Sequence, residues 1–214
     1  PGNNNTAATQ FNWTYDGTAP VLTQVTAIAT PTNDTTPSYV YTTSEAGTIT
    51  SNLAFSTSSS AATGSNQTIT FNALSEGTYT GTTITVTDAY GNAGSLTLPD
   101  FVIDTTGPVA NTSSLSDVTG QCSVTSLTAP TATDNCSGTV TGTTTTSLPI
   151  TSQGTTVVTW TYTDGEGNTS TQTQNVVIDD TTAPVVNDPS LSDVTAECSV
   201  TSLTAPTATD NCSG

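Results

Sequence analysis

Residues 156–164 read TVVTWTYTD, and this stretch decides the fold class. Val158, Trp160 and Tyr162 fall on one side of an extended chain, and threonines fall on the other side. A period of two with one apolar face is typical of a half-buried antiparallel strand. No stretch shows the 3.6-residue period of an amphipathic helix. The sequence therefore predicts an all-β protein.

The same alternation recurs along the chain. Threonine makes up about a quarter of the residues, and its β-branched side chain suits strands. Such runs, separated by Gly, Asn, Asp and Ser turns, predict sandwiches of roughly seven strands. The alternating apolar residues are Ile69 and Phe71, Ile84 and Val86, Phe101 and Ile103, Val176 and Ile178, and, near the beginning, Phe11, Trp13 and Tyr15.

An internal repeat organises the chain. Residues 114–138 return 76 positions later as residues 190–214, with Gly120 replaced by Ala196 and Gln121 by Glu197. D-x-T-x-P segments begin at Asp16, Asp104 and Asp180, the last two again 76 positions apart. Punctuation at a fixed period indicates an array of similar domains.

These marks predict four segments. Residues 1–16 are the last strand of a preceding repeat, and residues 17–104 form one immunoglobulin-like repeat. Residues 105–180 form a second repeat with one disulfide, and residues 181–214 begin a third. We expect tandem immunoglobulin-like antiparallel β-sandwiches in an elongated array, cut from a longer protein.

The charge balance excludes several functions. The chain has 17 acidic residues and no Lys, Arg or His, so its formal net charge is −17. Nothing can neutralise nucleic-acid phosphate, and the same charge disfavours docking on an anionic membrane. Catalytic triads and phosphoryl transfer need bases that are missing. We expect no enzyme, and we interpret Glu45, Glu76, Glu166 and Glu197 as solvated carboxylates rather than a glycosidase pair.

The four cysteines fall into two pairs that share the repeat frame. Cys122 and Cys136 are 14 positions apart, and so are Cys198 and Cys212. The simplest connectivity is one disulfide within each repeat, which would stabilise the domain by about 3 kcal/mol. Disulfides place the protein in an oxidising compartment, and no close Cys or His spacing suggests zinc.

Acidic residues at the domain junctions suggest a cation site. We expect calcium to be held by Asp16, Asp104, Asp179 and Asp180, with Asp134 and Asn135 or Asp88 and Asn92 of an adjoining unit. Calcium takes six to eight oxygen ligands, which carboxylates, amides and backbone can supply. The alternative is that the acidity only keeps the surface soluble. The segments at 88–92 and 164–168 are read as hairpin turns, with a calcium loop as the second reading.

The second unit resembles the hyalin repeat family. The matching features are Cys122, the run Asp134-Asn135-Cys136-Ser137-Gly138, and the strand that ends at Asp164 before Gly167-Asn168. The first unit lacks cysteines and resembles instead the bacterial immunoglobulin-like repeats of giant surface adhesins. The combination is similar to the motility adhesins of gliding Bacteroidetes. That resemblance implies a cell-surface location and O-glycosylation of the Asp-Thr-Thr triplets at Thr35, Thr105 and Thr181.

These observations predict an extracellular structural stalk of an adhesin or filament. Its partners would be neighbouring repeats, and surface polysaccharide would bind through regions outside this chain. Two alternatives stay open. One is a self-assembling fibre subunit in which a leading strand completes a neighbour's sandwich. The other is a glycan-binding module, for which only Tyr90 offers an aromatic ring in a loop.

Overall fold

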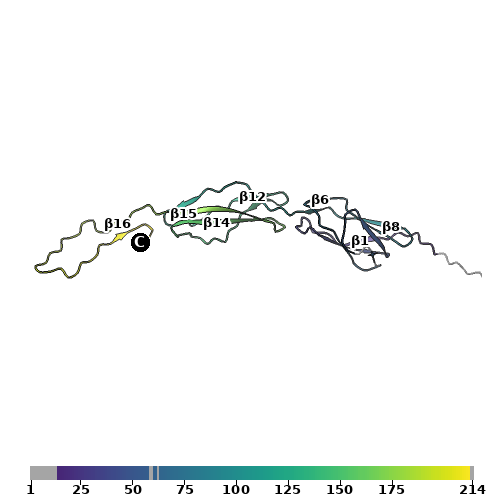
Figure 1. Ribbon diagram of the computed structural model, residues 1–214, viewed down its shortest axis with the longest axis horizontal. Coiled ribbons are helices and arrows are strands. Elements are labelled where there is room, and N and C mark those ends of the chain that lie inside the picture. Colours follow the sequence, from purple (N-terminus) through teal and green to yellow (C-terminus); the bar gives the residue numbers. More distant parts are fainter. Residues whose placement is uncertain (1–13, 58–59, 62, 213–214) are drawn as a thin grey trace, which may run out of the picture. The chain divides into compact units, whose positions relative to one another are not determined.

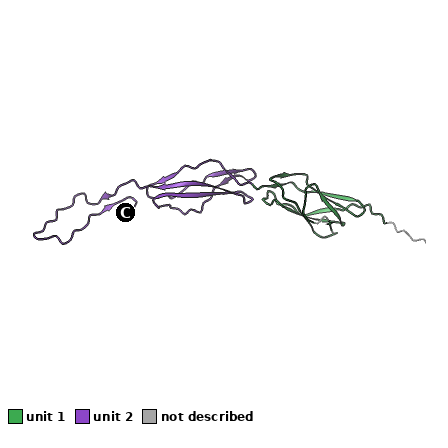
Figure 2. Cartoon of the chain, in the orientation of Figure 1, with its two compact units in different colours: residues 1–105 green, residues 106–214 purple. Residues whose placement is uncertain are grey.

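This computed structural model describes residues 14–57, 60–61 and 63–212. Within these residues the regular secondary structure consists of β-strands, which turns and loops connect. This confirms the all-β prediction. The chain divides into two compact units, residues 1–105 and residues 106–214 (Figure 2). Among the described residues there is no helix with the length and apolar character needed to span a membrane.

Unit 1 is built from three small antiparallel sheets. Their strand orders are β1-β2-β5, β4-β3-β7-β8 and β6-β9. The strands are β1 (Leu22–Thr26), β2 (Ser38–Thr43), β3 (Gly47–Ser51), β4 (Ser60–Ala61), β5 (Gln67–Thr70), β6 (Gly77–Tyr79), β7 (Thr83–Thr87), β8 (Ala93–Thr97) and β9 (Phe101–Ile103).

Unit 2 contains a long hairpin with shorter strands around it (Figure 1). The sheet orders are β10-β12-β13, β11-β15-β14 and β16-β17. The strands are β10 (Val109–Ala110), β11 (Val118–Gly120), β12 (Thr131–Asp134), β13 (Gly138–Thr141), β14 (Gly154–Thr163), β15 (Thr169–Ile178), β16 (Val185–Val186) and β17 (Ala208–Thr209).

The alternation in residues 156–164 sets the core of unit 2. Val158, Trp160 and Tyr162 are buried along β14, as the period of two predicts. Val176 and Ile178 of β15 join the core beside Val158 and Trp160. The polar tips of the rings are paired, because Trp160 Nε1 donates to Gln174 Oε1 and Tyr162 Oη donates to Gln172 Oε1.

The core of unit 1 centres on β2 and β7. Tyr39 and Tyr41 alternate along β2 and are fully buried, against Ile84 and Val86 of β7. Tyr39 donates its hydroxyl to Gln24 Oε1 of β1. Desolvation raises the pKa of Tyr41 to about 12, so its phenol stays neutral. The predicted leading strand with Phe11 and Trp13 lies outside the described residues, apart from its end at 14–16.

One pairing departs from a purely antiparallel sandwich. β11 runs parallel to the end of β15, with Val118 opposite Val176 and Gly120 opposite Ile178. Unit 1 has the same feature in reduced form, a parallel bridge between Thr32 and Ile103. In each unit a segment that follows the first strand therefore lies parallel to a later strand, β9 in unit 1 and β15 in unit 2.

Residues 181–214 form only a short ladder. β16 and β17 pair through Val185–Thr209 and Val186–Ala208. Leu191, Val194 and Leu203 are each at least 60% exposed, whereas Leu115, Val118 and Leu127, 76 positions earlier, pack against the core of unit 2. The difference follows from the sequence: this segment has no counterpart of β14 and β15 to cover its apolar face.

The core assignment is tested by Ile178→Ala, which removes a fully buried side chain from β15. We expect unit 2 to lose about 2–5 kcal/mol of unfolding free energy, because the truncation leaves a cavity. Denaturation followed by Trp160 fluorescence in a Trp13→Phe background measures this loss. The matched control is Val157→Thr, at a 58% exposed position of β14, with an expected change of about 0.5 kcal/mol or less. Equal effects of the two changes would contradict the assignment.

Candidate cation sites and the disulfide between repeats

Three acidic positions recur at the same places in the sandwich. One lies at the D-x-T-x-P segment before a unit, one follows the second long strand, and one opens the turn of the last long hairpin. In unit 1 these are Asp16, Glu45 after β2, and Asp88 after β7. One carboxylate oxygen from each lies within 4.8 Å of the others. Asp16 and Asp88 were predicted ligands, whereas Glu45 was read as solvated.

The turn after β7 holds Asp88 as an anion. Its Oδ1 accepts hydrogen bonds from the backbone N–H groups of Tyr90 and Asn92, both at 2.8 Å. Its Oδ2 accepts from Asn92 Nδ2 at 2.8 Å. The side-chain bond from Asn92, with the backbone bonds, lowers the pKa of Asp88. Asn92 therefore positions a carboxylate, and its amide nitrogen also donates to the Asp16 carbonyl.

Glu45 responds in the opposite direction. Desolvation raises the pKa of Glu45, and the negative charges of Asp16 and Asp88 raise it further. A carboxyl that resists ionisation beside two carboxylates is in a site with excess negative charge. A divalent cation there would oppose the effect of Asp16 and Asp88 on the pKa of Glu45.

The corresponding place in unit 2 holds two buried carboxylates. Asp134 ends β12 and is 5% exposed, and Asp164 follows β14 and is 8% exposed. They contribute oxygens within 4.8 Å of one another. Asp164 is held as Asp88 is: Oδ1 accepts from the backbone of Glu166 and Asn168, and Oδ2 accepts from Asn168 Nδ2.

Asp134 is only half satisfied. Its Oδ1 accepts from the backbone N–H groups of Cys136 and Ser137, at 2.8 and 2.7 Å. Its Oδ2 is buried and has no hydrogen-bond partner among the described residues. A buried carboxylate oxygen without a partner carries a large desolvation cost. This oxygen, next to Asp164, is the observation that most directly points to a bound cation.

The start of the third repeat shows the same arrangement. Asp180 and Asp210 contribute oxygens within 4.8 Å of one another, together with the sulfur of Cys212. The 76-residue offset relates Asp180 and Asp210 to Asp104 and Asp134. Asp104 itself is fully buried in unit 1. Its assignment as a ligand stays a prediction.

Other predicted ligands are not brought into these groups. Asp179 uses its backbone N–H to donate to the carbonyl of Gly120 and belongs to none of the acidic groups within the described residues. The assignment of Asn135 stays a prediction. Sequence reasoning missed Glu45 and Asp210 as site residues and gave Asp164 only in the second reading of the 164–168 turn. Each of the three closely follows a strand, but the convergence of these strand ends depends on the sandwich topology.

The disulfide differs from the predicted connectivity. Cys122 is bonded to Cys212, with a Cα–Cα distance of 4.9 Å and a separation of 90 residues. The predicted pairs, Cys122–Cys136 and Cys198–Cys212, are therefore wrong. Cys136 and Cys198 lie outside this bond and are exposed.

The reason for the correction is the length of the central hairpin. Cys122 directly follows β11, which pairs with the end of β15 at Val176–Ile178. Ser137, next to Cys136, accepts a hydrogen bond from the backbone of Gly165, just before β15 begins. A ten-residue strand spans about 30 Å, and a disulfide needs Cα atoms within about 7 Å. The two cysteines of one repeat thus sit at opposite ends of it.

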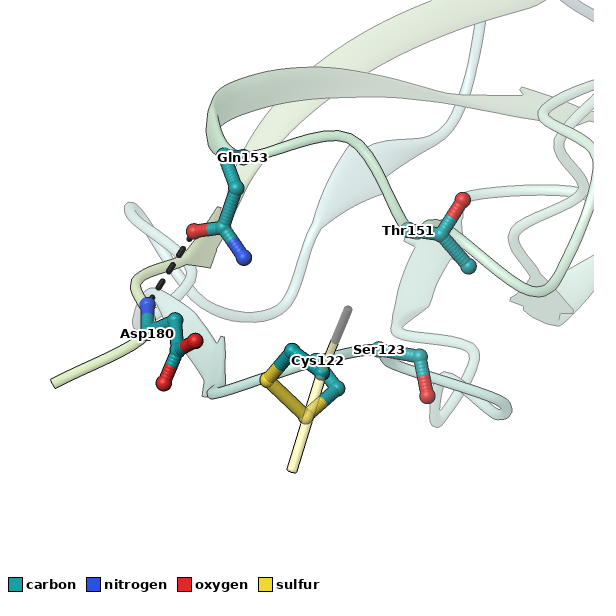
Figure 3. Close-up of a pocket in the computed structure, with 6 residues that line it drawn as sticks. Cys122, Ser123, Thr151, Gln153 and Asp180 are labelled. Carbon is teal, nitrogen blue, oxygen red and sulfur yellow. Dashed lines mark hydrogen bonds between the residues drawn. A yellow bond between two sulfur atoms is a disulfide. The ribbon is translucent and has the colours of Figure 1, made fainter. Parts of the chain in front are cut away.

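Polar contacts surround the disulfide. Figure 3 shows Cys122 with Ser123, Thr151, Gln153 and Asp180 around it, and Gln153 Oε1 accepts from the backbone N–H of Asp180 at 3.1 Å. The neighbouring Gln121 Oε1 accepts from Thr182 Oγ1 at 2.7 Å and from Asn211 Nδ2 at 3.2 Å. Residues of the third repeat therefore dock on the end of the second.

The charge coupling in unit 1 is tested by Asp16→Asn. We expect the pKa of Glu45 to fall toward its ordinary value, because a neighbouring negative charge is removed while Asn keeps the acceptor used by Thr18. Because the folded-state pKa of Glu45 is raised, this group makes unit 1 less stable as pH rises through that pKa. NMR titration of the Glu45 side chain measures the change. Asp34→Asn, at an exposed position outside the acidic groups, should leave it unchanged.

Comparison with known proteins supports the repeat assignment in part. Residues 108–178 match the family described as HYR-like domain with 4 cysteines, and this range contains two cysteines, Cys122 and Cys136. Hyalin from Strongylocentrotus purpuratus is 42% identical over 154 residues, covering 62% of this chain and 13% of that protein's length.

Two solved structures are also similar in part. Protocadherin gammaB7 EC3-6 has a TM-score of 0.33 and 16% identity, covering 81% of this chain and 54% of that one. Protocadherin Gamma B2 domains 3-6 has 0.33 and 14%, with the same coverage. Residues 108–178 therefore resemble a HYR-like domain, and 62% of the chain is similar to a part of hyalin that makes up 13% of that protein.

Proposed function

We propose that this chain is a structural segment of an extracellular adhesion protein, in which hyalin-type repeats follow one another and cations stiffen the junctions. The HYR-like match, the similarity to hyalin and the near-identical repeat support an array. The disulfide supports an oxidising, extracellular location. The stalk holds a distal binding region away from its point of attachment.

The cation proposal rests on Asp134. Its buried Oδ2 has no hydrogen-bond partner among the described residues, and Asp164 lies beside it in a chain without any basic side chain. Two buried carboxylates this close need a neighbouring positive charge, and no side chain of this sequence supplies one. A cation supplies that charge without the long side chain of Lys or Arg.

The donor set fits calcium. Apart from the sulfur of Cys212, which is bonded in the disulfide, the groups offer hard carboxylate oxygens, and backbone and water oxygens can complete a shell of six to eight. Asp134 and Asp164 are the ligands in unit 2, and Asp16, Glu45 and Asp88 are those in unit 1. Asp180 and Asp210 would form the next site, and Asp104 is proposed by its equivalence with Asp180. Bound calcium would hold the junction loops together.

The finer predictions stay proposals of lower rank. A glycan-binding role has one exposed ring in its favour, Tyr90 at 57% exposure. Assembly by strand complementation would use the exposed apolar face of residues 190–204. A role in gliding motility, contact with surface polysaccharide and glycosylation at Thr35, Thr105 and Thr181 rest on the family resemblance alone.

Calcium binding in unit 2 is tested by Asp134→Asn, which keeps the Oδ1 acceptor for Cys136 and Ser137 and removes the charge at Oδ2. We expect calorimetric titration of the wild-type chain with calcium to give saturable heat, and the variant to lose one site. Asp117→Asn is the matched control, because Asp117 is exposed and outside the acidic groups.

The stiffening is tested on the same samples by small-angle X-ray scattering. The account expects calcium to narrow the distribution of conformations for the wild type, and less so for Asp134→Asn. Wild-type protein that gives no heat and no change in scattering with millimolar calcium would remove the cation from the proposal, and the structural role would rest on the disulfide alone.

A further inference from the structure

The observed disulfide joins non-equivalent positions of consecutive repeats. Cys212 is the counterpart of Cys136, 76 positions later. The bond therefore runs from the first cysteine of one repeat to the second cysteine of the next. Because each first cysteine lies at the far end of its repeat and each second cysteine at the near end, the same geometry recurs wherever two such repeats follow one another.

The surface around Cys122 binds the loop Asp210-Asn211-Cys212, which is called the D-N-C loop below. Gln121 Oε1 accepts from Asn211 and from Thr182, and Gln153 is tied to both partners, donating to the Gln121 carbonyl and accepting from the Asp180 N–H. Asp210 Oδ1 accepts from the Cys212 N–H at 2.9 Å, which fixes the loop that presents the sulfur. Asp134 and Cys136 make the same bond at 2.8 Å. The loop is therefore shaped before it docks.

The third repeat carries in its sequence the part of this surface that surrounds the first cysteine. Residues 190–214 differ from 114–138 only at two positions, and both lie beside the first cysteine. Glu197 replaces Gln121 and keeps an oxygen that can accept from Asn and Thr. Ala196 replaces Gly120, where a Cβ would meet the Ser123 carbonyl oxygen at 2.7 Å, so the backbone there must shift slightly. Cys198 is exposed.

We propose that Cys198 is the attachment site for the D-N-C loop of a further hyalin-type repeat in the same polypeptide. Each junction between two such repeats then carries one covalent staple. Two thiols lose two protons and two electrons as the S–S bond forms, and a disulfide oxidant such as oxidised glutathione takes them up and leaves as two thiols. This inference does not depend on cation binding.

The disulfide holds residues 181–212 against the second repeat, where their noncovalent contacts are few. Residues 181–212 have no buried side chain, and their apolar residues are exposed. The bond closes a loop of 90 residues, and in the chain-entropy description a longer closed loop gives a larger stabilisation. A staple of this kind fixes neighbouring repeats before the next core is complete.

The first test counts thiols in the denatured, oxidised chain. Under the staggered pairing, Cys198→Ser removes one thiol relative to the wild type, because Cys212 stays bonded to Cys122. Under pairing within repeats, the same change releases Cys212 and adds one thiol. The two outcomes differ in sign, and the second would overturn the proposal.

The second test supplies the missing partner. A copy of residues 139–214, with Cys198→Ser within the copy, is appended after Gly214, and Cys136→Ser is introduced in the original chain. After refolding with oxidised and reduced glutathione, cleavage before Asp places each remaining cysteine in a different fragment. We expect fragment 193–209 to be linked to the last five residues of the copy, and fragment 117–133 to the fragment that begins at Asp210. A bond between fragments 193–209 and 210 onward would overturn the proposal, and so would a dimer linked through Cys198.

Discussion

The absence of any positively charged side chain is the constraint on which the rest of the structure depends. Seventeen acidic residues share the chain with no Lys, Arg or His, so no carboxylate can be neutralised by a side chain. A buried carboxylate must then be satisfied by N–H donors or by a cation. Buried Asp164 shows the first solution, with three donors from a tight turn, and the partly buried Asp88 is held in the same way. Asp134 shows where that solution is incomplete.

The junction between repeats concentrates both means of joining. At the start of the third repeat, Asp180, Asp210 and the bonded Cys212 lie within 4.8 Å of one another. The covalent bond brings the loop of one repeat to the end of the previous one, and the carboxylates are gathered at the same place. The function we propose rests on this arrangement, because a disulfide and a cation at the same place would join consecutive hyalin-type repeats.

The strands could be predicted because their signal is local. The period of two along residues 156–164 depends only on which face of β14 is buried, and the structure buries Val158, Trp160 and Tyr162 as expected. The residues of the acidic groups were only partly predictable. Asp16 and Asp88 stand out by position, but Glu45 joins them only because the loop after β2 and the turn after β7 meet at one end of the sandwich.

The cysteine pairing failed for the same reason. A spacing of 14 residues does not tell whether the two cysteines lie at the same end of the repeat. The chain between Cys122 and Cys136 runs from one end of the second repeat to the other. The observed pairing can be described by the repeat offset, because Cys122 is bonded to Cys212, the residue 76 positions after Cys136. Choosing it required knowing that β11 ends beside the end of β15.

The most direct test of the account is a crystal structure of the chain grown with calcium chloride, with anomalous differences measured at long wavelength. The account predicts a calcium peak about 2.3–2.6 Å from Asp134 Oδ2 and from a carboxylate oxygen of Asp164. A structure in which these two carboxylates share a proton, or are bridged only by water at millimolar calcium, would contradict it.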